Sequence, residues 1–265
     1  MHSVLAAVLV AALSPQAQGG VGPKHRPEEY EFLRTETGYV LPEGVFEADA
    51  TLQHLEFDEF RRIPGRPDIT AQALVAELAY GITDWVTAEV EVPFRRLDFD
   101  PGSSESGIGD IGLEGKVSLK RGPSPIGLVP DIDLAAGARV TLPTGDEDEG
   151  LGEENATFGL FVSTSHWIEK WFGLHGWVQG ELQEDRRPVW RANAAAEFAP
   201  WDPAFSLFGA LDFEREGSDS PAVSLIPGAQ YRFPAMPLAL GAGLPLGLSS
   251  RAADWGLLLN GEFRF

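Results

Sequence analysis

Apolar and polar residues alternate along most of the chain from Gly44 onward. In the clearest segment, 131–143, aliphatic side chains take every second position, and charged or hydroxyl side chains take most positions between them. Because successive side chains of a β-strand point to opposite faces, this pattern predicts strands with one apolar and one polar face. Such strands suit a barrel whose outside contacts lipid and whose lumen contacts water.

Twelve segments of this kind follow one another at similar spacing. They are 45–57, 70–81, 86–99, 108–120, 131–143, 156–167, 172–183, 189–199, 204–215, 222–233, 238–249 and 254–265. An even number of strands is typical of single-chain bacterial barrels. Beyond the N-terminus, no apolar run approaches the roughly 20 residues of a membrane-spanning helix. The pattern predicts an all-β protein, a transmembrane antiparallel up-and-down β-barrel of about twelve strands.

Three prolines argue against this prediction, because proline cannot donate a hydrogen bond to a strand ladder. Pro93, Pro227 and Pro245 lie inside predicted strands, and a closed barrel has no free edge to accommodate them. Segment 238–249 also has almost no polar face. A secreted soluble β-sandwich or barrel is therefore the alternative fold.

Short turns and longer polar loops alternate between the predicted strands. The short turns are 81–85, 168–171, 199–203 and 234–237, and the loops are 58–68, 100–107, 144–155, 184–188, 216–221 and 250–254. Because outer-membrane barrels have short periplasmic turns and longer outer loops, both termini are expected in the periplasm, with 120–130 as a long exception. An aromatic girdle is then expected at the periplasmic rim, formed by Trp85, Trp167, Trp171 and Trp201.

The N-terminus has the features of an export signal. Val4 to Leu13 is an apolar run of suitable length, and Ala17-Gln18-Gly19 supplies small residues for cleavage, although no Lys or Arg precedes the run. We expect a signal peptide at 1–19, a periplasmic segment at 20–43 that could also enter the lumen, and the barrel at 44–265. A short buried helix is the alternative for the first segment.

Composition narrows the classes of function. The 265 residues carry a net charge of −20 and include no cysteine. An acidic chain is a poor partner for nucleic acid. Without cysteine there is no disulfide, thiolate nucleophile or thiolate metal site. An acidic exterior is compatible with outer-membrane lipid whose anionic groups are bridged by divalent cations.

The C-terminus resembles a known assembly signature. The alternating segment 254–265 ends on an aromatic residue, as in bacterial outer-membrane barrels. In those proteins the barrel-assembly machinery recognises the last strand. The resemblance makes Phe263 and Phe265 candidate assembly-signal residues and the machinery an expected partner.

Three internal segments carry a second resemblance. They are 79–94 (AYGITDWVTAEVEVPF), 106–119 (SGIGDIGLEGKVSL) and 134–146 (LAAGARVTLPTGD). Together they resemble a family of Gram-negative outer-membrane proteins named for the meta-cleavage pathway of phenol degradation and regarded as transporters. The resemblance implies an outer-membrane location and passage of small solutes, including hydrophobic or aromatic compounds. It brings no catalytic residues and no cofactor.

Strand parity places many more acids than bases on the inward face. The candidate lumen-lining residues are Glu47, Asp49, Glu77, Glu89, Glu91, Glu114, Lys116, Asp131, Asp133, Arg139, Glu181 and Arg191. The same parity is shared by Asp110, Glu197, Asp212, Glu214, Arg232, Glu262 and Arg264. Acidic rings favour cations, so we expect passive passage of small solutes with a preference for cations. Pairing of Glu114 or Asp133 with Arg139 would instead plug the lumen and give a non-conducting structural or adhesion barrel.

Catalysis and metal binding are further alternatives. His166 and His175 lie near Ser and Glu residues, which keeps a lipase- or acyltransferase-type barrel as a third option, but no G-x-S-x-G motif accompanies them. The acidic run 146–154 fails the EF-hand spacing and is expected to be a solvated loop with weak Ca²⁺ or Mg²⁺ association. We therefore expect no enzyme activity and no cofactor.

Overall fold

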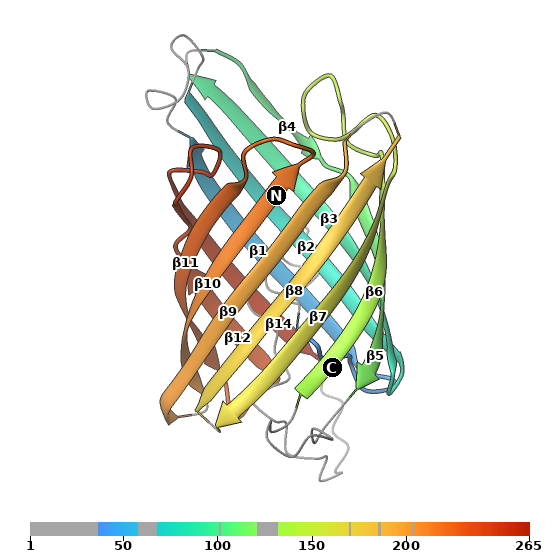
Figure 1. Cartoon of the computed structure of the whole chain (residues 1–265), viewed down its shortest axis with the longest axis vertical. Coiled ribbons are helices and arrows are strands. Elements are labelled where there is room, and N and C mark those ends of the chain that lie inside the picture. The colour runs from blue at the N-terminus through green and yellow to red at the C-terminus, as the bar shows by residue number, and fades with distance from the viewer. Residues whose placement is uncertain are drawn as a thin grey trace.

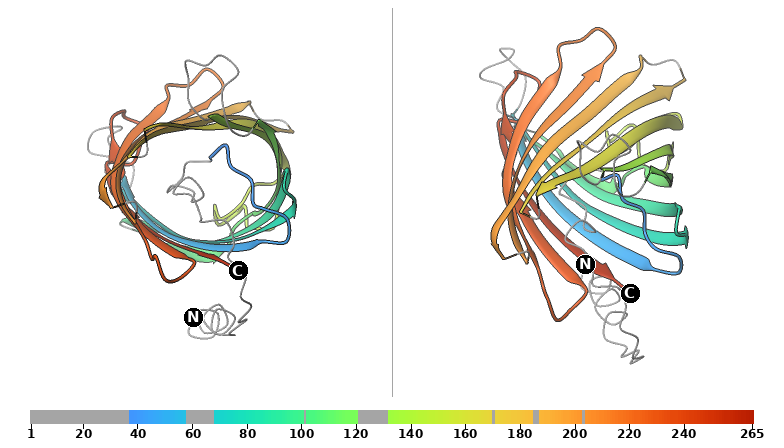
Figure 2. Two further views of the ribbon diagram at one scale, coloured as in Figure 1. Left: turned by 90° about the horizontal axis from the view of Figure 1, so that it is seen from below. Right: turned by 60° about the horizontal axis from the view of Figure 1, so that its bottom comes forward.

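The computed structural model describes residues 37–57, 68–100, 102–120, 132–169, 171–184, 187–202 and 204–265. They form one antiparallel sheet that closes on itself (Figures 1 and 2). The strands are β1 (Phe46–Phe57), β2 (Asp68–Thr83), β3 (Val86–Asp100), β4 (Ser104–Ile108), β5 (Ile111–Lys120), β6 (Ile132–Leu142), β7 (Thr157–Glu169), β8 (Phe172–Gln183), β9 (Val189–Asp202), β10 (Phe205–Glu216), β11 (Ala222–Arg232), β12 (Leu238–Gly243), β13 (Leu246–Gly247) and β14 (Trp255–Arg264). In the described part of the chain, no helix is long and apolar enough to cross a membrane.

Neighbouring strands pair in chain order, and β14 pairs with β1 to close the ring. β4 and β5 both pair with β3, while β12 and β13 both pair with β11 and β14. Each of these two pairs is one interrupted strand, so fourteen segments make a twelve-stranded barrel. The predicted all-β, twelve-stranded antiparallel barrel is confirmed, and the single closed sheet contradicts the β-sandwich alternative.

The two interruptions account for the three prolines. β4 ends and β5 begins beside Pro93, whose carbonyl accepts a hydrogen bond from the Gly109 N–H at 2.8 Å. Pro245 lies in the break between β12 and β13, where the Leu244 N–H donates to the Pro227 carbonyl at 2.9 Å. The prolines therefore lie where the ladder is already irregular, and the closed barrel does not require regular pairing there.

The barrel has two different ends. The terminal end carries Phe265 and the connections 84–85, 121–131, 170–171, 203–204 and 233–237. The loop end carries the connections 58–67, 101–103, 143–156, 184–188, 217–221 and 248–254. β2 and β3, with 16 and 15 residues, extend farther toward the loop end than the sequence predicts.

The predicted tryptophan girdle is only partly correct. Trp85 and Trp171 are about half exposed at the terminal end, at 54% and 46%. Trp167 is only 8% exposed, and its ring meets that of His175 with centroids 5.8 Å apart. Trp167 lies at the expected end of the barrel but faces the lumen, because it shares the inward parity of Ser165. The side chain of Trp201 lies outside the described residues.

Candidate functional site

An acidic chamber occupies the inside of the barrel. This cavity of about 610 Å³ reaches from Glu47, toward the terminal end, to Glu216, at the loop end. Among the described residues, its lining includes thirteen carboxylates but four guanidinium groups, so the chamber is strongly negative. The acids are Glu47, Asp49, Glu77, Glu89, Glu91, Asp110, Glu114, Glu153, Glu181, Asp212, Glu214, Glu216 and Glu262, and the bases are Arg95, Arg139, Arg187 and Arg191.

Nine of the twelve candidate lumen residues lie on this lining. They are Glu47, Asp49, Glu77, Glu89, Glu91, Glu114, Arg139, Glu181 and Arg191. Lys116 lies instead on a cavity of about 10 Å³ toward the terminal end. Asp133 is on β6, where its carbonyl accepts a hydrogen bond from Thr164, and it is not part of the lining. Asp131 lies outside the described residues.

Arg139 forms an ion pair that the sequence did not predict. Its Nη2 lies 2.6 Å from a carboxylate oxygen of Glu91, whereas Glu114 or Asp133 was expected as the partner. Glu91 is on β3 and Arg139 is on β6, so the guanidinium reaches across β5. It passes over Gly112, where a Cβ would lie 2.7 Å from Nη2. Glu114 is still the register neighbour of Arg139 on β5.

Arg191 forms a second bridge on the opposite part of the wall. It pairs with Glu181 on β8 and with Glu214 on β10, the latter at 2.9 Å. The two bridges fasten Arg139 and Arg191 to the wall and use three carboxylates. The remaining carboxylates keep the chamber negative.

Residues 37–43, called the strap below, run inside the barrel near its terminal end (Figure 2). The strap is fastened to hydroxyl groups by its backbone: Ser163 donates to the Thr37 carbonyl (2.8 Å), the Gly38 N–H donates to Ser165 (3.1 Å), and the Leu41 N–H donates to Thr87 (2.8 Å). The hydroxyls come from β7 and β3, so the strap spans one side of the lumen. Its Val40 and Leu41 are 1% and 4% exposed.

The strap forms part of the chamber floor. Tyr39 and Leu41 border the small cavity of about 10 Å³ together with Glu47 and Glu89, which also line the chamber. Gly38 lies so close to the wall that a Cβ would be 2.3 Å from the Asp133 carbonyl oxygen. Only glycine permits this approach.

Asp110 fixes the long loop 143–156 at the loop end. One of its carboxylate oxygens accepts the N–H groups of Thr144 and Gly145, at 3.1 and 2.9 Å. The other accepts the N–H of Glu153 at 2.8 Å. Asp110 is 5% exposed, and Leu151, within the same loop, is 1% exposed. The carboxylate thus holds both arms of the loop against the barrel.

The three segments that carry the family resemblance are linked by hydrogen bonds to one another and to the start of the barrel. Gly81 and Thr87, in segment 79–94, bind the chain at the start of the barrel: Gly44 N–H donates to Gly81 O at 2.8 Å. Pro93, at the end of that segment, accepts the N–H of Gly109 in segment 106–119. Asp110 then binds the end of segment 134–146. The contacts of these turns are structural: they join backbone groups and hold a loop.

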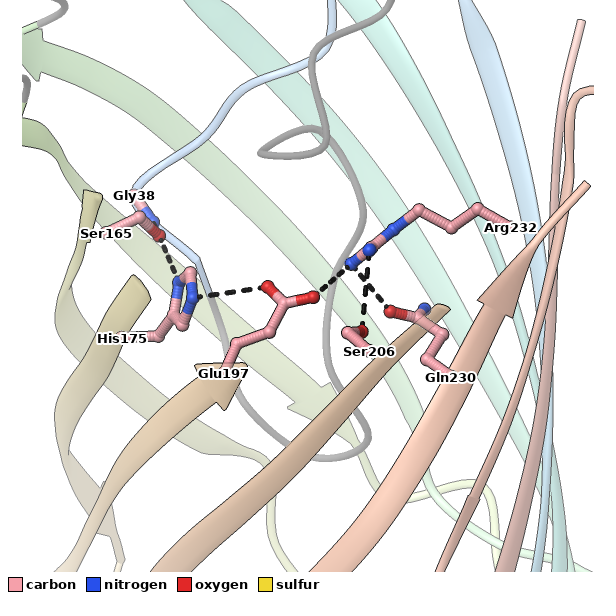
Figure 3. Close-up of polar contacts among 7 residues, drawn as sticks. All are labelled: Gly38, Ser165, His175, Glu197, Ser206, Gln230 and Arg232. Carbon is pink, nitrogen blue, oxygen red and sulfur yellow. Dashed lines mark hydrogen bonds and ion pairs between the residues drawn. The ribbon is translucent and has the colours of Figure 1, made fainter. Parts of the chain in front are cut away.

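A second polar cluster lies on the inner wall beside the strap (Figure 3). Ser165 Oγ lies 3.0 Å from His175 Nδ1, and a Glu197 oxygen lies 3.7 Å from His175 Nε2. Arg232 donates to the other Glu197 oxygen at 2.8 Å. Arg232 also contacts Gln230 at 2.9 Å. The cluster joins β7, β8, β9 and β11.

This order of serine, histidine and carboxylate resembles a catalytic triad, but its geometry fits a structural role. Ser165 is 2% exposed, and its hydroxyl already accepts the Gly38 N–H, so a substrate carbonyl has no path to it. The 3.7 Å separation between His175 and Glu197 is too long for a hydrogen bond. Glu197 is held by Arg232 instead. The cluster therefore supports the wall where the strap docks.

The structure also places the candidate metal-binding run and His166. Within the described ranges, no group of three or more His, Asp or Glu side chains is placed to hold a metal ion. In the acidic run 146–154, Asp146 caps its own turn by accepting the Glu149 N–H at 3.2 Å. His166 lies on the outward parity of β7, away from Ser165.

Sequence parity missed several chamber residues. Arg95 lies within the predicted strand 86–99 and has the parity of Glu91, so applying the inward parity past Pro93 would have found it. Arg187 and Glu153 lie in connections between strands, where alternation gives no signal.

Comparison with known proteins identifies the fold. No family model matches the chain, and no curated protein matches it. The structure is similar to that of an outer membrane channel from Pseudomonas putida F1, with a TM-score of 0.72 and 17% identity over 88% of this chain and 100% of the channel. It is also similar to the KdgM porin (TM-score 0.54, 7% identity, 82% and 99% covered). The similarity to the NanC porin has a TM-score of 0.53 and 10% identity, and it covers 82% of this chain and 98% of the porin. At these identities the likeness establishes a shared barrel fold.

Proposed function

We propose that the chain is an outer-membrane channel of a Gram-negative bacterium, through which small solutes diffuse with a preference for cations. The observation that supports this proposal is the chamber, whose thirteen carboxylates outnumber its four arginines. Fixed negative charge in a confined lumen lowers the energy of a cation and raises that of an anion. The similar structures named above are a channel and two porins.

The proposed orientation follows from the two ends. The loop end faces outward, and the terminal end faces the periplasm, where both termini lie after removal of the signal peptide 1–19. The outer face of the barrel is rich in exposed apolar side chains, among them Leu113, Leu160 and Leu182 at 44%, 59% and 61%. Such a face requires lipid around it. The assembly machinery would insert the barrel by recognising Phe263 and Phe265.

The charged lining bears on the cargo. The family resemblance implies hydrophobic or aromatic compounds, but a chamber with this many carboxylates offers few apolar surfaces for them. Trp177 and Phe213 are aromatic exceptions on the described lining, Trp177 beside Gln179 and Glu181. We propose that polar or positively charged small solutes pass most readily.

The strap supports a second candidate, a non-conducting structural barrel. The three backbone hydrogen bonds of the strap, and the burial of Val40 and Leu41, narrow the lumen at the terminal end. If the strap closes the terminal end, the chamber is a pocket that opens only at the loop end.

Planar-bilayer recording distinguishes the two candidates. Purified protein is inserted into a bilayer that separates two KCl concentrations, and the reversal potential is measured. A steady conductance with a reversal potential of the sign set by K⁺ supports the cation channel. Protein that floats with vesicles and migrates as a heat-modifiable band, yet passes no current, supports the structural barrel.

A further inference from the structure

Four neighbouring strands change the polarity of their outer face at one common level. On β1 to β4, the register aligns one outward row of apolar residues, Leu52, Leu74, Phe94 and Ile108. Two residues farther toward the loop end, it aligns the polar row His54, Gln72, Arg96 and Ser106. The next row is Glu56, Thr70, Asp98 and Ser104. The change from apolar to polar therefore occurs within one repeat on every strand.

On β1 to β3 the inner face changes in the opposite sense, whereas on β4 the inward partner of Leu97 is Glu105. Below this level the inward side chains of β1 are Glu47, Asp49, Thr51 and Gln53, which line the chamber. Above it the register aligns Leu55, Ala71 and Leu97, and then Phe57, Ile69 and Phe99. A strand that remained in lipid would keep its apolar side chains outside. The inverted order indicates that water surrounds the upper part of these strands.

Contacts among the outer polar side chains support the same conclusion. Arg96 and Asp98 form three hydrogen bonds of 2.9 to 3.2 Å while their side chains are 52% and 35% exposed. His54 lies 3.1 Å from Glu56. Desolvating such exposed charges in hydrocarbon would be costly. By contrast, Leu52, Phe94 and Ile108 are 48%, 46% and 54% exposed in the isolated barrel.

An aromatic residue marks the same level. Trp255 of β14 is the register partner of Glu56, is 47% exposed, and places its ring 5.6 Å from that of His54. Tryptophan is typical of membrane–water interfaces. On β2 the outward apolar positions run from Leu74 to Ile82, about 21 Å along the membrane normal for a strand tilted by roughly 40°. This is close to the apolar band of about 25 Å expected for such barrels.

From this register we infer that the bilayer surface crosses β1 to β4 between the row Leu52–Leu74–Phe94–Ile108 and the row His54–Gln72–Arg96–Ser106. The parts of these strands above the boundary form a ribbon that stands in water at the loop end, where β2 and β3 rise in Figure 1. The inference rests on the proposed membrane location and states what surrounds each row. Hydrocarbon surrounds the lower row, and water and lipid headgroups surround the upper row.

Single cysteines test this boundary, because the chain has none of its own. Two pairs of variants compare positions two residues apart on one face: Leu74→Cys with Gln72→Cys, and Ile108→Cys with Ser106→Cys. Each protein is reconstituted into phosphatidylcholine vesicles, recovered by flotation, and exposed to a membrane-impermeant maleimide. Labelling of Gln72→Cys and Ser106→Cys is expected to be at least tenfold faster than that of their partners. In detergent-free denaturant all four should react equally.

Fluorescence quenching measures the depth of each of the four positions in the bilayer independently. A bimane attached at each position is quenched by lipids brominated along the acyl chain, and the two lower positions should be quenched far more strongly than the two upper ones. Protein that floats but shows equal labelling or equal quenching within both pairs overturns the boundary alone. Protein that fails to float with the vesicles overturns the membrane location and the boundary together.

Discussion

Phe46 and Phe265 exchange two backbone hydrogen bonds, so the last residue of the chain closes the barrel. The Phe46 N–H donates to the Phe265 carbonyl at 2.8 Å, and the Phe265 N–H donates to the Phe46 carbonyl at 2.9 Å. Their rings stack with centroids 5.6 Å apart, although Phe265 is 61% exposed. The next residues inward, Glu47 and Arg264, form an ion pair across the same seam.

This seam makes the effect of deleting Phe265 informative. A ring this exposed contributes about 1 kcal/mol of burial, and each of the two backbone hydrogen bonds to Phe46 about 1 kcal/mol, so a purely structural role predicts a loss of stability of a few kcal/mol at most. If the resemblance to the assembly signature holds, deletion should instead sharply reduce the assembled barrel and leave precursor in the periplasm, while Phe265→Tyr assembles normally. Pulse-chase fractionation measures both forms. Normal membrane amounts of the deletion variant would refute the signalling role.

Gly38→Ala is expected to displace the strap. The added Cβ would lie 2.3 Å from the Asp133 carbonyl oxygen, which is backbone and cannot move away easily. The loss of the Gly38 bond to Ser165 and the neighbouring contacts should widen the terminal end. Single-channel conductance should rise relative to wild type. Gly115→Ala is the control, because a Cβ there meets nothing within 4 Å. Unchanged conductance in Gly38→Ala would show that the strap does not limit passage.

The barrel could be predicted from sequence because alternation is a local property of each strand. Every predicted strand has a counterpart, and even the prolines that opposed the prediction lie at breaks in the ladder. Segment 86–99 was predicted as a strand almost to the end of β3, but the exchange of faces within it was not predicted: Arg96 is outward and Leu97 is inward, so the alternation changes phase above Phe94.

The contacts of the site could not be predicted in the same way, because they depend on register between distant strands. The Glu91–Arg139 pair requires β3, β5 and β6 to align so that Gly112 leaves room for the guanidinium. The strap has no alternation, and its bond from Gly38 to Ser165 joins residues 127 positions apart. Neither the partner of Arg139 nor the docking of the strap leaves a signal in a single sequence.

Asp110→Asn should loosen the loop 143–156. The carboxylate accepts three backbone N–H groups, and an amide offers one accepting oxygen, so at least one bond is lost. Hydrogen bonds to a charged group contribute about 1.5–3 kcal/mol each, so local opening should become easier by that order. Faster amide exchange at Thr144, Gly145 or Glu153 is the measurement. Asp148→Asn in the same loop is the control, and equal exchange in both variants would contradict the role of Asp110.

Asp219 links its own loop, 217–221, to the loops 248–254 and 184–188 at the loop end. The strength of these links should depend on pH. It accepts a hydrogen bond from Arg251 at 2.7 Å and lies 3.4 Å from Arg187. The Arg251 hydrogen bond lowers the pKa of Asp219 below its usual value. Since the folded-state pKa is lowered, the contribution is present above the ordinary aspartate pKa of about 4 and is lost as pH falls through the lowered pKa.

A spin label at Ser218→Cys reports this loss. Its mobility should rise as the pH is lowered below about 4, and the change should be small because the three side chains are exposed. In Asp219→Asn the label should be mobile at every pH. A pH response that survives in Asp219→Asn would assign it to another group.

Charge selectivity should depend on the acids of the chamber, Glu91 among them. Glu77→Gln together with Glu89→Gln removes two negative charges and leaves the Arg139 pair intact. Glu91→Gln removes one charge but also takes the carboxylate from Arg139, whose guanidinium then presents its charge to the lumen. Because the single substitution removes one negative charge from the lining and the double one removes two, we expect both to lower the K⁺/Cl⁻ permeability ratio, the double one more. The ratio is obtained from the reversal potential in a KCl gradient. Glu56→Gln, on the outer face of β1, is the matched control and should match wild type. If Glu91→Gln behaves like Glu56→Gln, the chamber does not set selectivity through this pair.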